Sequence, residues 1–544
     1  MSNYANSLYR DYEILEKKNK NLKYENKLLL IRAQVAESEQ LRLEKRNLQT
    51  ENLIFEKEKE LRESKKENEA LKNKIIKLTK QIDMTKYERD QYLAKLNIDG
   101  TNSGIPTSQT PINKKKHIPN SREKSSNNKG GQKSHKKHKL EKFFDEEINE
   151  HEEIILEECP NCHSHDLIEL DSEVTKDEFD YKIKVIKKRI HFKEYKCPKC
   201  NKIVRKNIPI NLKEDNQYGN NVQATALTLM NIGNVPINKT RKIINGLTTG
   251  EIDLSEGFIS KLQKRASSKL EQFIKDLKFY ITHLNLIYWD DTVVMINTKR
   301  GCMRFYGNED VALYCVHEHK DKKGLDKDNI LNMLPCSTIV EHDHNIINYN
   351  GEYSFVNAEC CQHLLRDLQK VTDNLPNRTW SSKMKKLFQE YDHKRNELIS
   401  KQIDRFSEEE FNTFVGGINQ NLLLGVEENL KDNKVYYSDK EEALLVRLME
   451  YRDNYIYWTL DFNLPFTNNL SERGLRGIKS KMKISGQFQN IGNAEYYAAI
   501  RSYLETCYRN NVNGHEALIR LLNNNPYTLE EILEVGRKNV DKSN

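Results

Sequence analysis

The sequence predicts a multidomain α/β protein in which a long helical segment, a basic linker and a cysteine-rich module precede the folded core. Three observations support this prediction. Residues 8–96 contain no glycine or proline, four of the ten cysteines form two Cys-Pro-x-Cys pairs, and short apolar segments typical of strands follow from residue 286. A chain of 544 residues is too long to fold around one compact core, so we expect about three or four structural units.

The composition is polar and carries only a mild net charge. Apolar residues make up 37% of the chain, charged residues 31%, and the formal net charge is +7. Part of such a chain is expected to be extended. No apolar run reaches the roughly 18 residues of a membrane helix, and the N-terminus lacks the apolar stretch of a signal peptide. We therefore expect a cytoplasmic protein with no membrane partner, whose paired cysteines bind metal.

The first predicted unit is a coiled coil over residues 1–96. Leucine recurs every seventh residue, at Leu8, Leu15, Leu22 and Leu29, and a second heptad register follows over residues 71–82. A sustained heptad repeat of apolar residues favours helices that pair along an apolar seam. We therefore expect a homodimer or a higher oligomer, and a single solvated helix is the alternative.

The second predicted unit is a basic linker over residues 97–140, which is rich in turn-forming residues. Residues 113–139 carry ten lysines or arginines against one acid. A cationic arm of this kind suits the phosphate backbone of nucleic acid, and a solvated tether is the alternative. The candidate contacts are Lys114, Lys115, Lys116, Lys136 and Lys137.

The third predicted unit, residues 141–215, is a zinc-binding module with β-rich sequence between its cysteine pairs. The predicted ligands are Cys159, Cys162, Cys197 and Cys200. Two cysteines on each of two turns can complete a tetrahedral four-sulfur shell around one structural zinc ion. A closed shell leaves no open position for catalysis, so we expect the zinc ion to stabilise the fold of a binding module. Four reduced cysteines without metal are the alternative, and His163 and His165 are possible substitute ligands.

Three acids stand where a metal site for phosphodiester chemistry is expected. Asp290 lies inside the apolar segment LIYWDDTVVMIN, where a buried acid is costly unless it has a function, and Asp291 points to the opposite face. Asp343 ends the later apolar run STIVEHD, and Glu472 lies on a predicted helix. Converging carboxylates suit Mg²⁺ or Mn²⁺, and two such ions about 4 Å apart can promote phosphodiester cleavage.

Each of these acids also has an ordinary structural interpretation. A strand-end acid such as Asp343 is often solvated, and Asn469 followed three residues later by Glu472 is a capping-box pattern. Nearby histidines could instead bind a transition metal. These histidines are His317, His319, His342 and His344.

One face of the helix that carries Glu472 is cationic. Arg476, Lys479 and Lys483 follow Glu472 by four, seven and eleven residues, so they share its face of the helix. With the neighbouring Arg473, they are candidate contacts to DNA phosphates held beside the acids. An ordinary solvated face is the alternative.

Taken together, these motifs resemble the insertion-sequence-66 family of bacterial DDE transposases, and the resemblance covers almost the whole chain. The matching segments include SGIPTSQTPINKKKHIPNSR, both Cys-Pro-x-Cys pairs, YWDDTVV, AECCQHLLRDLQK and FTNNLSERGLRGIKSKMKISGQF. The family's Cys-x-x-His-x-x-Arg signature falls on Cys360, His363 and Arg366. Its Asn-Asn-x-x-Glu-Arg element falls on Asn468, Asn469, Glu472 and Arg473. The chain departs from the family at Ser134, where glycine is usual, and at His344 and Asn345, which follow Asp343.

The resemblance implies an RNase-H-like core with Asp290, Asp343 and Glu472 as its catalytic triad and as ligands of two Mg²⁺ or Mn²⁺ ions. The segment between Asp343 and Glu472 is longer than a minimal core needs and implies an all-α insertion. The implied units are a helical DNA-binding region over 216–285, the core over 286–370 and 461–544, and the insertion over 371–460.

The implied function is transposition by a bacterial, nucleoid-associated protein. The implied reaction is hydrolysis at the ends of the element, followed by attack of the freed 3′-hydroxyl on target DNA. The implied partners are double-stranded DNA and companion proteins encoded by the same element. A catalytically inactive, zinc-containing DNA-binding or scaffold protein remains the alternative, as does a nuclease that cuts without rejoining.

Overall fold

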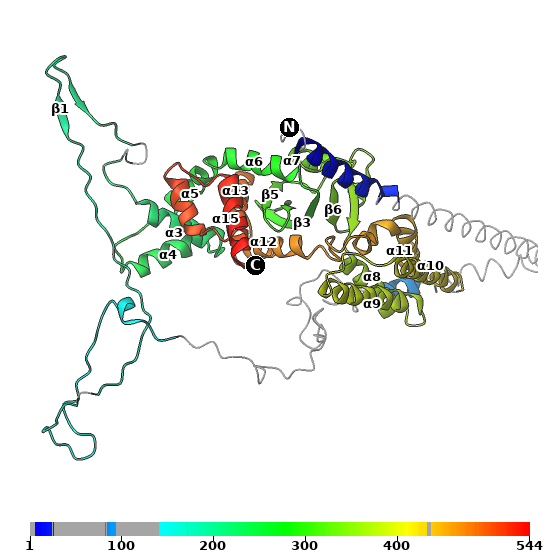
Figure 1. Ribbon diagram of the computed structural model, residues 1–544, viewed down its shortest axis with the longest axis horizontal. Helices are drawn as coiled ribbons and strands as arrows, with labels where there is room; N and C mark the ends of the chain where they lie inside the picture. Colours follow the sequence, from blue (N-terminus) through cyan, green and yellow to red (C-terminus); the bar gives the residue numbers. More distant parts are fainter. Residues whose placement is uncertain are drawn as a thin grey trace, which may run out of the picture. The chain divides into compact units, whose positions relative to one another are not determined.

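The computed structural model describes residues 6–23, 25–26, 82, 84–93, 141–170, 172–209, 212, 214–431 and 437–543. The chain divides into two compact units, Met1–Lys95 and Leu96–Asn544 (Figure 1). In the first unit, residues 6–23 and 84–93 are helical and largely exposed. The second heptad register lies almost entirely outside the described residues and the basic linker wholly outside them, so the coiled coil and the cationic arm stay predictions.

A short hairpin carries the second cysteine pair. Strands β1 (Glu194–Lys196) and β2 (Ile203–Arg205) are antiparallel, and Cys197 and Cys200 lie in the turn between them. The described residues of 141–209 form no other strand, so the predicted β-rich character is limited to this hairpin.

The second unit contains one five-stranded mixed sheet. Its strands are β3 (Leu286–Ile296), β4 (Lys299–Gly307), β5 (Ala312–His317), β6 (Ile339–His342) and β7 (Val356–Glu359). Their order is β5-β4-β3-β6-β7, in which β3, β4 and β5 are antiparallel while β6 and β7 run parallel to β3. The apolar segments LIYWDDTVVMIN, MRFYG, VALYCV and STIVEHD predict four strands, and these strands are β3, β4, β5 and β6. The sequence from residue 357 to 460 predicts helices, and this prediction is wrong at its start because Val356–Glu359 form β7.

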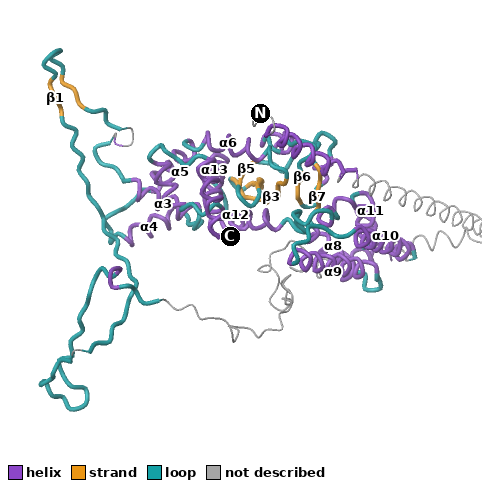
Figure 2. Tube along the Cα trace, viewed as in Figure 1, coloured by secondary structure: helices purple, strands orange, loops and turns teal. Residues whose placement is uncertain are grey.

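Helices make up most of the regular secondary structure of the second unit (Figure 2). Before the sheet lie α3 (Asn220–Asn231), α4 (Ile237–Leu247), α5 (Glu256–Ser268) and α6 (Glu271–Ile281), and α7 (Lys322–Asp328) follows β5. After β7 come α8 (Cys361–Asn374), α9 (Trp380–Ser400), α10 (Glu408–Leu430) and α11 (Ser438–Glu450). The chain ends with α12 (Asn469–Ser485), α13 (Ile491–Arg509), α14 (Gly514–Leu522) and α15 (Leu529–Ser543). Among the described residues, none of these helices has the length and apolarity that a membrane span requires.

The two faces of the sheet pack against different sets of helices, with α13 contributing to both clusters. Tyr288 packs in a cluster with residues of α12 and α13, whereas Trp289 packs in a cluster with residues of α3 to α6. Because successive strand residues face opposite sides, Asp290 faces α12 and Asp291 faces the other side. This alternation separates the two neighbouring acids, as the sequence predicts.

Helix α13 covers the open edge of the sheet at β5. The backbone N–H of Tyr314 donates to Ser502 Oγ at 2.8 Å, and that of Ala312 donates to Thr506 Oγ1 at 3.2 Å. Unpaired N–H groups on an edge strand are otherwise available to another chain. The hydroxyls of α13 satisfy them and fix the sheet against the C-terminal helices.

Helices α8 to α11 lie between β7 and α12, and we call them the helical insertion; they begin at Cys361, before the predicted boundary at residue 371. The polar centre of the insertion is Glu441, which is fully buried and accepts hydrogen bonds from Arg378, Trp380 and Asn429 at 2.7–3.0 Å. These partners come from α9, α10 and the turn before α9. A buried charge needs such partners, so this cluster ties the helices of the insertion together.

Helix α12 lies unusually close to the sheet because of a glycine. A Cβ at Gly474 would meet the ring of Phe305 at 2.9 Å. The hydroxyl of Tyr314 donates to the Gly474 carbonyl at 3.0 Å. The close approach explains why a residue that disfavours helices stands in the middle of α12.

We expect Gly474→Ala to destabilise the protein by about 1–3 kcal/mol, because the added methyl group overpacks the contact with Phe305. The matched control is Gly416→Ala on α10, where a Cβ meets no atom within 4 Å. There alanine should stabilise the helix by up to about 1 kcal/mol. Denaturant unfolding of both variants tests the pair, and equal changes would contradict the close packing of α12.

Candidate active site

Asp290 lies in the middle of β3 and faces α12. Burial is the main cause that raises the pKa of Asp290 to about 8, and the nearby charges of Asp343 and Asp291 add to it. Lys479 of α12 acts in the opposite direction but more weakly. A strand acid with so little compensating charge is typical of a site that binds a cation.

Asp343 follows directly after the last residue of β6. Its Oδ1 lies 2.9 Å from Nδ1 of His363, which stands in the first turn of α8. The pKa of His363 is raised, because the contact with Asp343 outweighs the lowering effect of burial. Asp343 is therefore engaged by α8, and the interpretation of a merely solvated strand-end acid does not hold.

Glu472 lies in the first turn of α12, with its side chain directed at α8. Its Oε1 is 3.9 Å from both Nε2 of His363 and Nη1 of Arg366. The capping-box interpretation is wrong: the N-cap residue is Asn468 rather than Asn469, and its side chain makes no capping hydrogen bond. Glu472 is thus available to the site.

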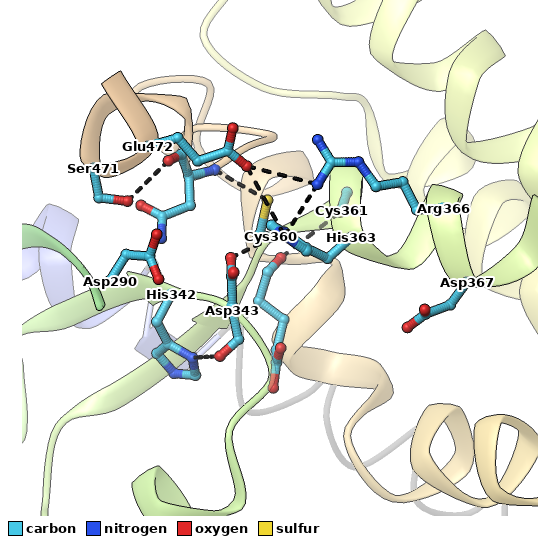
Figure 3. A network of polar contacts seen from close by, with 12 residues as sticks. Asp290, His342, Asp343, Cys360, Cys361, His363, Arg366, Asp367, Ser471 and Glu472 are labelled. Carbon is cyan, nitrogen blue, oxygen red and sulfur yellow. Dashed lines mark hydrogen bonds and ion pairs between the residues drawn. The ribbon is translucent and has the colours of Figure 1, made fainter. Parts of the chain in front are cut away.

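The three acids meet at one place, although they come from β3, the end of β6 and α12 (Figure 3). The pKa of Asp290 is raised partly by Asp343, which indicates negative charge without a matching cation. Hard carboxylate oxygens of this kind suit Mg²⁺ or Mn²⁺, so the residues present fit the metal ions that the sequence predicts.

A second set of donor atoms overlaps this site. Asp343, Cys360 and His363 each offer one ligand atom, and these atoms lie within 4.8 Å of one another. A transition metal is disfavoured there by Arg366, whose Nη1 lies 3.2 Å from His363 Nε2. Arginine can only donate, so Nε2 accepts and the imidazole proton lies on Nδ1, the atom a metal would need.

Asn468 connects the start of α12 to β3 and to the start of α8, and it is fully buried. Its Nδ2 donates to the carbonyl of Trp289, next to Asp290, at 2.9 Å. Its backbone N–H donates to Cys360 Sγ at 3.2 Å. One residue at the start of α12 thereby contacts β3 and the start of α8. Reasoning from the residues alone missed this role, and only the family's paired asparagines pointed to the position.

Asp291 belongs to a separate network on the opposite face of the sheet. Lys320 Nζ lies 2.7 Å from Asp291 Oδ1. Nearby, the buried Asp328 accepts from Tyr306 at 2.8 Å and lies 2.6 Å from His317 Nε2. Because Asp291 pairs with Lys320 on this face, it lies outside the site.

The histidines considered for a transition metal have other partners. His317 is engaged by Asp328, and His342 Nε2 lies 2.8 Å from the side-chain oxygen of Asn357. His344 pairs with Glu359 at 2.7 Å. Together with His319, they do not form a three-ligand group within the described part of the chain.

Two further acids lie near the site. Burial, reinforced by the charges of Glu359 and Asp343, raises the pKa of Glu341 well above its usual value. Asp367 lies apart from the triad (Figure 3) and pairs with Arg447 at 2.9 Å.

The two Cys-Pro-x-Cys pairs form turns of the same geometry. In each turn, the first cysteine donates its N–H to the carbonyl five residues later, at 3.0 and 2.9 Å. His163 and Asn201, which follow the second cysteines, have φ of 60° and 55°. Backbone N–H groups lower the pKa of Cys159 and Cys197, which favours thiolates. In the described residues, the sulfurs of Cys159, Cys162, Cys197 and Cys200 do not gather at one point, so the zinc site stays a prediction.

The cationic row on α12 is exposed beside the acids. Glu472 is the one acidic residue of this helix. The exposed members of the row are Arg473, Arg476, Lys479 and Lys483. Helix α12 thus carries negative charge at Glu472 and positive charge along its exposed face.

The comparisons with known proteins agree with this geometry. Residues 215–496 match the family described as Transposase IS66 family. A search of the curated proteins found no match. The matched segment covers more than half of the 544 residues and includes Asp290, Asp343 and Glu472. The chain therefore belongs to the IS66 family of transposases.

Proposed function

We propose that this protein cleaves the ends of its element by metal-dependent hydrolysis and joins the freed 3′-hydroxyl ends to target DNA. The observation that carries the proposal is the convergence of Asp290, Asp343 and Glu472 from three separate elements. The sheet supports an RNase-H-like core, because three antiparallel strands are followed by two strands parallel to the first.

The three acids would hold two Mg²⁺ or Mn²⁺ ions. When bound, such a pair activates the attacking oxygen and stabilises the leaving oxygen of a phosphodiester. The chain contributes the ligands, and the partial burial of Asp290 limits the access of water. The same set of acids serves hydrolysis and strand transfer, since a water and a 3′-hydroxyl can occupy the same attacking position.

Two cationic helices support binding of double-stranded DNA near the acids. The exposed row on α12 is one, and α4, which has no acidic residue and exposes Lys239 and Lys242, is the other. Asn234, in the turn before α4, donates to the Gly477 carbonyl of α12 at 3.1 Å. This contact attaches the start of α4 to α12, so cations of both helices could contact one DNA backbone.

The N-terminal units complete the proposal. One structural zinc ion would join the two cysteine turns into a folded binding module. A coiled coil over residues 1–96 would pair two chains, which allows one assembly to hold both ends of the element. Companion proteins encoded by the same element would act with this assembly.

Changing any one of the triad acids should nearly abolish cleavage. We expect Asp290→Asn, Asp343→Asn and Glu472→Gln each to slow end cleavage more than about 100-fold, since even outer partners of metal ligands contribute about 10–100-fold. DNA binding should persist, because it depends on cations elsewhere. Double variants should lose little more than single ones.

The matched control for the triad is Asp291→Asn, which removes the same charge one residue away on the opposite face. It should cleave at close to the wild-type rate. The assay is cleavage of a labelled element end, with a binding gel on the same variants. Normal cleavage by all three triad variants would overturn the enzymatic proposal and favour a scaffold protein.

The purified protein should contain about one zinc ion per chain, as expected for a closed four-sulfur site. Elemental analysis of the variant carrying Cys159→Ser and Cys197→Ser should find the zinc lost. Cys336→Ser is the control, because Cys336 is an exposed cysteine outside the turns. Zinc retained in the double variant would contradict the site.

DNA binding should weaken steeply with salt through the basic linker. Each neutralised phosphate contributes about 0.9 to the slope of log affinity against log salt. Replacing the lysines of the linker by glutamine should therefore lower that slope by up to about 4.5. The replaced residues are Lys114, Lys115, Lys116, Lys136 and Lys137. An unchanged slope would indicate that the linker is a solvated tether and not a contact to DNA.

A further inference from the structure

Asp343 lies just beyond the end of β6, where the strand no longer fixes its side chain. We propose that His363 and Arg366 of α8 are positioning residues that orient Asp343, and with it Glu472, for metal binding. This inference rests on the proposed function, because it assigns the acids to a metal site. In this proposal, the first turns of α8 contribute to the metal site by orienting its acids.

The three side chains form a chain of polar contacts. Arg366 Nη1 lies 3.2 Å from His363 Nε2, and His363 Nδ1 lies 2.9 Å from Asp343 Oδ1. Both atoms of the second contact are buried, and the contact is an ion pair by distance without hydrogen-bond alignment, since neither atom has a hydrogen-bond partner among the described residues. His363 therefore has one acidic partner at close range, and Arg366 stands directly behind it.

The direction of these contacts follows from the chemistry of arginine. Because a guanidinium only donates, Nε2 of His363 accepts from Arg366 and Nδ1 carries a proton. This nitrogen lies 2.9 Å from Asp343 Oδ1, at ion-pair distance. The second oxygen of the carboxylate is then left for a metal ion, which is how an outer imidazole orients a ligand in many metal sites.

Glu472 approaches the same pair, and the cationic Arg366 is the member that attracts it. Its Oε1 lies 3.9 Å from His363 Nε2 and from Arg366 Nη1. Cys360, at the start of α8, accepts the backbone N–H of Asn468 and so fixes the start of α12 against α8. A small part of α8 thus sets the positions of two acids that lie far apart in the sequence.

The first test measures metal affinity without catalysis. Calcium is the probe, because its longer bonds and looser geometry suit binding rather than cleavage. In calorimetric titrations of the full chain, His363→Ala and Arg366→Gln should weaken Ca²⁺ binding about 10–100-fold. Thermal unfolding of the same variants should show that the fold is intact.

The conservative variants separate positioning from simple packing. His363→Asn keeps an N–H donor near the position of Nδ1, and Arg366→Lys keeps a donor behind the histidine. Both should recover part of the lost Ca²⁺ affinity. The matched control is Lys370→Gln, which removes a cation one turn further along α8, where Lys370 pairs with Asp367 at 3.0 Å. It should bind Ca²⁺ like the wild type.

The second test follows end cleavage against Mg²⁺ concentration. For a positioning role, His363→Ala should raise the Mg²⁺ concentration for half-maximal cleavage more than it lowers the maximal rate. A lower maximal rate with unchanged affinity for both metals would overturn the proposal and make His363 a contact to DNA. Wild-type behaviour of His363→Ala and Arg366→Gln would overturn it as well. A different result would contradict the proposed function, namely normal cleavage by the triad variants.

Discussion

The convergence of three carboxylates places like charges in a partly buried space, and much of the surrounding structure reduces the repulsion between them. Burial is the main cause that raises the pKa of Asp290, and the charges of Asp343 and Asp291 add to it. Burial and the charges of Glu359 and Asp343 also raise the pKa of Glu341, which disfavours a further negative charge beside Asp343. His363 and Arg366 approach from α8. Under the proposed function, a divalent cation would offset the remaining repulsion between the acids.

The fold brings the acids together by pressing α12 against the sheet. Gly474 allows this helix to approach Phe305 closely, and Asn468 attaches its first turn to the backbone of β3. Neither contact involves an acid directly. Both determine where Glu472 lies, because a helix is rigid over one or two turns and its first turn follows the position of its start. The packing of α12 against the sheet therefore determines the geometry of the site.

Several features of the site follow from sequence because they depend on local periodicity. The opposite directions of Asp290 and Asp291 follow from the two-residue period of a strand, and the exposed row that begins near Glu472 follows from the helical period. The roles of Asn468 and His363 depend on contacts between distant segments, which periodicity does not encode. The short β7 was missed for a related reason: the segment VNAE has no apolar run and is a strand because it pairs with β6.

The helical insertion contributes to the active site through α8. This helix carries His363 and Arg366 on one side, and Asp367 pairs it with Arg447 of α11 on another. The insertion is in turn held together by the buried Glu441 and its three partners. A displacement of α11 would therefore move α8, and with it the imidazole that faces Asp343. The long segment between the second and third acids is thus a structural part of the site that those acids form.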